Sequence, residues 1–359
     1  MKKSYYDVMG EPAVPPLDEF GLIRVWTEGR QSASFLASAG VTLGIGDDAA
    51  VVSANADKEW LLAVDTMVED IHFKPDTMED ADIGFKALAA NISDIAAMGG
   101  VPKHALVSVS VPPSWGAERM ERLYEGLYAC AAKYGVAIVG GDTTSSPSHM
   151  VVAVTVVGCV EAGRAIRRSG SHPGQVVFLT GPTGMSAGGL HGMLSRAEAE
   201  RKGSMRLPPL PPQRLIDAHR RPQPSVRAGR LLLELELASS LNDVSDGLAS
   251  EAWELAEASG AKLIIREKEL PISGELAGYA GLCGVSPLEW MLYGGEDYVL
   301  LGTADSGKEA FLRESFRSAG LPLFVIGVVE EGLPGVELES ASGKRRPLAK
   351  RGYNHFARG

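Results

Sequence analysis

The segment DADIGFKALAANISDIAAMGG, residues 80–100, decides how the first half of the chain folds. Its apolar side chains recur on one face at helical spacing: Phe85, Leu88, Ile92 and Ile95. The segment ends in a pair of glycines, which commonly stop a helix. Short apolar runs at 60–65 and 104–111 flank it, so the sequence predicts a helix between strands, as in an α/β fold.

The same alternation continues outward from this helix. Helices are expected at 18–30 and 116–134, and strands at 136–141 and 151–160. The basic, glycine- and proline-containing segment 161–174 then lacks any periodicity, which is typical of a junction between domains.

A chain of 359 residues exceeds what one hydrophobic core usually supports. We therefore predict an N-terminal domain at 18–165 and a C-terminal α/β domain at 166–359, which starts with a strand at 175–181. Residues 196–224 are polar and rich in proline and arginine, and we predict a surface loop or docking segment there rather than a core element.

Composition and charge restrict the class of protein. The chain has 45 acidic and 35 basic residues, and its net charge of −10 argues against nucleic acid or an anionic membrane as partner. Cys130, Cys159 and Cys283 are widely spaced and form no CxxC, so we expect neither a disulfide framework nor a zinc site. Because no apolar run has the length of a membrane span, and the N-terminus lacks the apolar core of a signal peptide, a cytoplasmic protein is predicted.

Acidic residues beside glycines recur in short segments next to apolar runs. The segments are GIGDDAA (44–50), AVDTMVEDIHF (63–73), ANISDIAAMGG (90–100), GGDTTSSP (140–147), NDVSDGL (242–248) and YGGEDYVLL (293–301). Any one of them is explained as an ordinary turn, since Asp satisfies turn backbone and Gly supplies positive φ. Six such segments would place many carboxylates together, and their repulsion predicts bound multivalent cations.

The residue types indicate which cation and which chemistry. The candidate ligands are all oxygens, which suit Mg²⁺ or Mn²⁺, and Mg²⁺ in proteins commonly shares its shell with phosphate. The chain has no P-loop motif and no protein-kinase HRD or DFG motif. GPTGMSAGG (181–189) follows a strand and opens a helix, and a helix-packing turn is favoured there over a phosphate cradle.

The ordered set of motifs resembles the thiamine-monophosphate kinase family, in the superfamily of aminoimidazole ribonucleotide synthetase and selenophosphate synthetase. The motifs that carry the resemblance, from about residue 20 to 356, are GIGDDAA, NISDIAAMGG, GGDTTSSP, GRAIRRSG, HRRPQPSVRAG, DVSDGL, GGEDY and GYNHF. The resemblance implies a two-domain fold with an N-terminal mixed sheet that pairs in a homodimer and a C-terminal α/β sandwich. It also implies phosphoryl transfer from ATP to thiamine monophosphate, which gives thiamine diphosphate.

The resemblance assigns roles to individual residues. Those implied as magnesium ligands are Asp48, Asp65, Asp94, Asp142, Asp243 and Asp246. Those implied as ATP contacts are Gly141, Asp142, Arg168 and Ser245. Those implied as contacts to thiamine monophosphate are His72, Glu296 and Tyr353. No residue is assigned as a general base, because the acceptor phosphate is already ionised near neutral pH.

Several alternatives accompany these assignments. Asp47 is interpreted as holding the turn and ranks below Asp48 as a ligand, and Asp297 is a candidate structural partner beside Glu296. His72 has a structural alternative as a partly buried histidine. The family often has Ser or Thr at the positions of Ala63 and Val64, so one magnesium site here would lack those side-chain ligands.

Two other functions compete with the kinase. Another ATP-using synthetase of the same superfamily is the first, although selenophosphate synthetase would be expected to carry a reactive Cys near the N-terminus, and the first here is Cys130. A non-catalytic protein that binds nucleotide or thiamine phosphate is the second.

Overall fold

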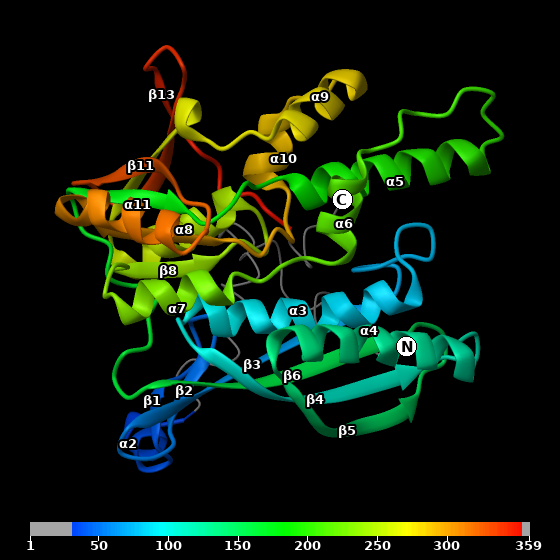
Figure 1. The fold of residues 1–359 in the computed structure, drawn as a ribbon, viewed down its shortest axis with the longest axis horizontal. Helices are drawn as coiled ribbons and strands as arrows, with labels where there is room; N and C mark the ends of the chain where they lie inside the picture. The colour runs from blue at the N-terminus through cyan, green and yellow to red at the C-terminus, as the bar shows by residue number, and fades with distance from the viewer. Residues whose placement is uncertain (1–30, 354–359) are drawn as a thin grey trace, which may run out of the picture.

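The structure, a computed structural model, describes residues 31–353 (Figure 1). The helix expected at 18–30 and the last residues of the GYNHF motif lie outside this range. Within it, two sheets, each with helices, confirm the predicted two-domain α/β fold. None of the helices in this range has both the length and the apolar character needed to cross a membrane.

The N-terminal domain is built on a six-stranded mixed sheet with the order β1-β2-β3-β6-β4-β5, in which only β4 and β5 are parallel. Its strands are β1 (Val41–Leu43), β2 (Ala50–Ser53), β3 (Lys58–Val68), β4 (Val101–Val111), β5 (Ala137–Ser145) and β6 (Val151–Glu161). Its helices are α2 (Ala33–Ser38), α3 (Asp80–Ala97) and α4 (Ala117–Tyr134). The long strands and helices agree with the sequence-based expectations.

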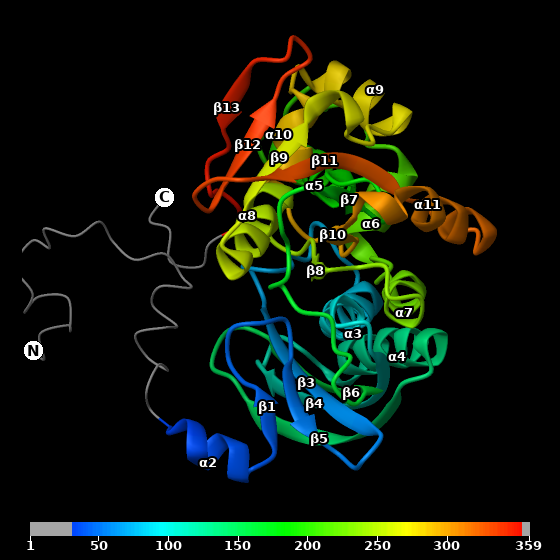
Figure 2. The same cartoon turned by 90° about the vertical axis from the view of Figure 1, so that its left-hand side faces the viewer.

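The helix α3 organises the interior of the molecule. Asp80 and Asp82 lie in its first turn, where the helix dipole stabilises their negative charges. Most of the residues of α3 are buried. It packs tightly on α4 because Gly84 has no side chain: a Cβ atom there would lie 1.9 Å from the carbonyl oxygen of Leu123. Both views show α3 and α4 between the N-terminal sheet and the C-terminal domain (Figures 1 and 2).

The C-terminal domain is built on a seven-stranded sheet with the order β13-β12-β9-β11-β7-β10-β8. Its strands are β7 (Gln175–Leu179), β8 (Ser240–Asp243), β9 (Lys262–Arg266), β10 (Leu300–Asp305), β11 (Phe324–Glu330), β12 (Gly335–Glu339) and β13 (Arg345–Pro347). Its helices are α5 (Met185–Arg201), α6 (Gln213–Arg220), α7 (Val226–Glu234), α8 (Leu248–Ser259), α9 (Gly274–Cys283), α10 (Pro287–Tyr293) and α11 (Glu309–Ser318).

One hydrophobic core joins the two domains. It contains Leu88 and Ile92 of α3 together with Leu232 of α7 and Phe178 of β7, all fully buried. A second core lies entirely within the C-terminal domain, on the other face of its sheet. Helix α3 is therefore held in place by packing against both the N-terminal sheet and the C-terminal domain.

The prediction of a surface loop over 196–224 was wrong in part. Helix α5 extends to Arg201, and α6 buries Leu215, Ile216 and His219 against its neighbours. A two-turn helix between prolines and arginines is too short for its apolar period to stand out, so tertiary packing decides its burial. The intervening stretch 202–210 is mostly exposed, as expected.

Candidate functional site

A cleft of about 1350 Å³ lies between the two domains. Its walls come from the loop before β2, the end of β3, α3, α5 and the loops after β8 and α10. The predicted site residues that line it are Asp48, Asp65, His72, Asp94, Arg168, Asp243, Ser245, Asp246, Glu296 and Tyr353. Residues that are up to about three hundred positions apart in the sequence thus share one cavity.

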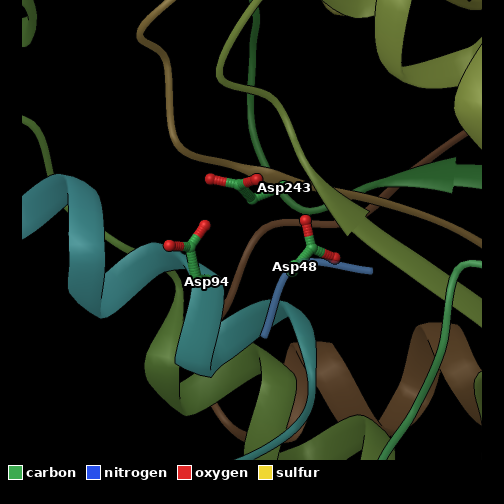
Figure 3. A group of neighbouring side chains, drawn as sticks. All are labelled: Asp48, Asp94 and Asp243. Carbon is green, nitrogen blue, oxygen red and sulfur yellow. The ribbon is translucent and has the colours of Figure 1, made fainter. Parts of the chain in front are cut away.

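Three aspartates form a candidate metal centre in this cleft. Asp48 follows the Gly-Ile-Gly turn, Asp94 projects from α3, and Asp243 ends β8. One carboxylate oxygen of each lies within 4.8 Å of the others, and Figure 3 shows the three side chains converging from separate segments. This spacing lets a single cation contact all three carboxylates.

The electrostatics of the cluster favour a cation. Burial and the charge of Asp48 raise the pKa of Asp243 to about 8. The pKa of Asp94 is raised well above its usual value by burial, with further contributions from Asp65 and Asp243. One carboxylate oxygen of Asp48 and one of Asp243 are buried without a hydrogen-bond partner. Oxygen donors, crowding and unpaired acceptors together fit Mg²⁺.

Arg168 supplies the positive charge nearest to the cluster. Its guanidinium Nη2 lies 2.6 Å from Asp48 Oδ1, its Nε donates to Asn242 Oδ1 at 3.2 Å, and its Nη1 lies 3.5 Å from Glu254 Oε2. A single arginine cannot neutralise three aspartates. Its predicted contact with ATP stays a prediction, and the structure shows it compensating Asp48.

Asp47 differs from its neighbour Asp48 in its contacts. Its Oδ1 accepts the backbone N–H of Asp48 at 3.0 Å, and its Oδ2 accepts the backbone N–H of Arg168 at 3.2 Å. Its Oδ1 therefore holds the turn itself, and its Oδ2 ties the turn to the interdomain segment. The geometry favours the turn-holding interpretation of Asp47.

Glu251 was missed from the sequence, although it organises the DVSDGL loop. This buried carboxylate in α8 accepts hydrogen bonds from Asn242 Nδ2 at 2.6 Å, the Asp246 backbone N–H at 3.0 Å and Ser245 Oγ at 3.3 Å. The only sequence signal was an acid among the apolar residues of a helix. Glu251 thereby fixes the loop that carries Asp243 and Asp246.

His72 and Tyr353 lie close together on the cleft wall. Their ring centroids are 6.2 Å apart, and His72 Nδ1 accepts the backbone N–H of Val68 at 3.0 Å. The backbone N–H of Tyr353 donates to the carbonyl oxygen of Asp246 at 3.3 Å, which ties the C-terminal segment to the metal-site loop. The two rings form an aromatic surface beside the aspartates.

Glu296 and Asp297 are adjacent but do different things. Asp297 Oδ1 accepts the backbone N–H of Ser186 at 3.1 Å, and Asp297 also accepts the N–H of Gly184 at the start of α5. The protein's own carboxylate thus occupies this helix N-terminus, which favours the helix-packing interpretation of GPTGMSAGG over a phosphate cradle. Glu296 instead reaches the cleft.

The structure does not bring Gly141 and Asp142 to the cleft of their own chain. Across the sheet, Asp65 pairs with Val154, Val154 with Val107, and Val107 with Gly141. Three strand spacings separate Asp65 from this position of β5, a distance of about 14 Å. Asp142 pairs with Ser108, which is exposed on the outer face of the sheet, whereas Asp65 lies on the side of α3.

Comparison with protein families identifies the class. Residues 46–160 match the N-terminal domain of AIR synthase related proteins, and residues 172–338 match the C-terminal domain. Fold and interdomain cleft together therefore define an AIR synthase related protein.

Individual relatives narrow this class. Thiamine-monophosphate kinase of Bacillus subtilis (strain 168) is 41% identical over 342 residues, covering 95% of this chain and 100% of the relative. The enzyme of the same name from Aquifex aeolicus (strain VF5) is 34% identical over 340 residues, with 95% and 98% covered. A solved structure of AaThiL complexed with AMPPCP and TMP has a TM-score of 0.76 at 32% identity and covers 94% of this chain and 97% of that one. The chain belongs to the thiamine-monophosphate kinase family.

Proposed function

We propose that the chain transfers the γ-phosphoryl group of ATP to thiamine monophosphate, with Mg²⁺ held by Asp48, Asp94 and Asp243. The observation that carries the proposal is the convergence of these three carboxylates, Asp243 buried and the other two partly buried, in a cleft that also contains Glu296. Family membership and the AaThiL complex with an ATP analogue and TMP support the same reaction.

The residues of the cleft suit a reaction that joins two polyanions. The acceptor phosphate is ionised near neutral pH, so the reaction needs no base, and the described part of the cleft is rich in carboxylates instead. Mg²⁺, when bound, supplies charge neutralisation between the two phosphate chains and at the transferring group. Arg168 and Glu251 hold the ligands in position, and Asp65 and Asp246 lie beside them as further acids.

We also propose a homodimer through the outer face of the N-terminal sheet. On this face Trp60 and Leu62 of β3 and Leu106 of β4 are 38%, 38% and 44% exposed, an unusual row of large apolar side chains. Asp142 lies on the same face, so its predicted role at Mg²⁺ and ATP belongs to the cleft of a partner subunit, and Gly141 would share that role.

The dimer is tested by light scattering after size exclusion. Leu62→Asp is expected to give a monomer, while Leu210→Asp, at a 68% exposed leucine away from the sheet, should leave the dimer intact. A monomeric wild-type protein contradicts this part of the proposal.

The proposal also covers the cellular compartment of the protein and the boundary between its two domains. We place the protein in the cytoplasm, where ATP is available and where the three cysteines, free in the structure, stay reduced. We keep the boundary at 165/166, in the segment between β6 and β7.

The reaction is tested by incubating the purified chain with ATP, Mg²⁺ and thiamine monophosphate. Thiamine diphosphate and ADP are the expected products, and removal of Mg²⁺ with a chelator should stop their formation. Retention of ATP without product would favour the non-catalytic alternative, and product from another acceptor would favour a different synthetase.

A further inference from the structure

A second group of charges surrounds Glu296, which lines the same cleft as the aspartates. Lys86 of α3 is fully buried, and its Nζ lies 2.5 Å from Glu296 Oε1. His219 of α6 is 1% exposed, and its Nδ1 lies 3.3 Å from Glu296 Oε2. The two oxygens of one carboxylate are thus held by residues from two different domains. We call Lys86, His219 and Glu296 the carboxylate clamp.

An apolar side chain at the position of Lys86 would stabilise the fold more than the buried ammonium group does. A buried ammonium group is strongly destabilising unless it is paired. In the described part of the chain, Glu296 is the one acid within ion-pair distance of Lys86, and Lys86 Nζ has no other polar partner. The Lys86 side chain therefore neutralises the Glu296 carboxylate and fixes its position.

His219 holds the second oxygen. Its Nδ1 also lies 3.0 Å from Ser186 Oγ, and its Nε2 is buried without a partner. The neutral ring with its proton on Nδ1 satisfies this arrangement, because that tautomer donates toward Glu296 and leaves no unpaired N–H on Nε2. Burial lowers the pKa of His219, in agreement with a neutral ring.

The backbone at Glu296 is strained. Its φ is +67°, and Tyr298 two residues later has φ of +51°. Residues other than Gly rarely adopt positive φ values. Such strain persists only where the surroundings determine the conformation, and it occurs most often at functional sites. The strain and the clamp together fix a carboxylate that keeps 27% of its side chain exposed in the cleft.

We propose that Lys86 and His219 are positioning residues for recognition of the acceptor substrate: they hold the carboxylate of Glu296 toward the cationic or N–H-donating part of thiamine monophosphate. The inference rests on the proposed function and adds two residues to which the sequence analysis assigned no role. Neither Lys86 nor His219 lines the cleft, so both act through Glu296.

The test compares Lys86→Met, His219→Leu and Glu296→Gln with wild type. Each variant is expected to raise KM for thiamine monophosphate about tenfold, since a hydrogen bond to a charged group contributes that much, with KM for ATP unchanged. His219→Gln keeps a donor and should restore most of the lost affinity. The double variant Lys86→Met/Glu296→Gln should be no worse than Glu296→Gln alone, because Lys86 acts only through Glu296.

Arg221→Met is the matched control. Its Nε lies 2.6 Å from Asp82 Oδ1 of α3, so it removes an ion pair next to α6 without touching the cleft. Its KM values should equal those of wild type. Equal changes in KM for ATP and for thiamine monophosphate, or full additivity in the double variant, would overturn the inference.

Calorimetric titration of thiamine monophosphate in the presence of AMPPCP separates this inference from the proposed function. Binding by wild type that the clamp variants weaken, without turnover, would sink the kinase proposal alone. If wild type binds no thiamine monophosphate, both fail. Should Lys86→Met not fold, the pair His219→Leu and His219→Gln gives the same test.

Discussion

The same cleft contains two groups of charged side chains whose electrostatics are opposite. The aspartate cluster gathers like charges, so the pKa of Asp243 rises to about 8 through burial and the charge of Asp48. In the carboxylate clamp, burial is outweighed by Lys86 and His219, and the pKa of Glu296 falls to about 2. The proposed cation would balance the charge of the first group, whereas Lys86 already balances the charge of Glu296 in the second.

The largest expected effect comes from breaking the aspartate cluster. Asp94→Asn should lower kcat about a thousandfold, because several kcal/mol of charge stabilisation by the metal would be lost. Circular dichroism should show an intact fold. Turnover like that of wild type would remove Asp94, and with it the metal-centre assignment, from the proposal.

Breaking the support of the cluster should have a smaller effect. Glu251→Gln keeps the shape of the side chain but replaces one acceptor oxygen by a donor, which faces the N–H groups of Asn242 and Asp246. We expect kcat to fall about tenfold, in line with losing a hydrogen bond at a buried site. A higher Mg²⁺ concentration needed for half-maximal activity would be the diagnostic readout; an unchanged one would contradict the role.

Variants of the two charge groups should change the stability of the Mg²⁺-free protein in opposite directions. Asp243→Asn relieves repulsion and should raise Tm at pH 8, while Glu296→Gln leaves Lys86 buried and less well paired and should lower it. Differential scanning fluorimetry of both variants checks this. Shifts of the same sign would show that the two groups do not differ as described.

The smallest expected effect is a change in pH dependence. The folded pKa of Asp243, about 8, lies above its ordinary value of 3.8, so its stabilising contribution is complete below pH 3.8 and is lost as pH rises through about 8. The Tm of the metal-free protein should therefore fall less between pH 6 and 9 in Asp243→Asn than in wild type. Glu296, with its pKa lowered to about 2, loses its contribution only as pH falls through that value, so in wild type it adds nothing to this slope.

Local sequence patterns predicted the scaffold well. The apolar spacing of 80–100 predicted α3, because a buried helix carries apolar residues every three to four positions. The acid-glycine turns indicated the candidate ligands because carboxylates beside buried strands are unfavourable without a cation. The motif order indicated the family, which the relatives then showed.

The same patterns missed residues whose role depends on distant partners. No pattern distinguishes Lys86 on its helix, and His219, although it begins the motif HRRPQPSVRAG, lies in a segment predicted as a surface loop. Glu251 looked like an ordinary helix residue. Asp142 was grouped with the other aspartates because its turn resembles theirs, yet the sheet places it on the opposite face.

The sequence by itself predicted the type of chemistry, since many candidate oxygen ligands with no metal-binding Cys or His spacing favour Mg²⁺ and phosphate whatever the fold. Only the tertiary structure decided which carboxylates meet: Asp48, Asp94 and Asp243 converge, while Glu296 pairs with Lys86 and His219. The physical reason is that the effect of a buried charge depends on its neighbours within a few ångströms, and those neighbours come from segments far apart in the chain.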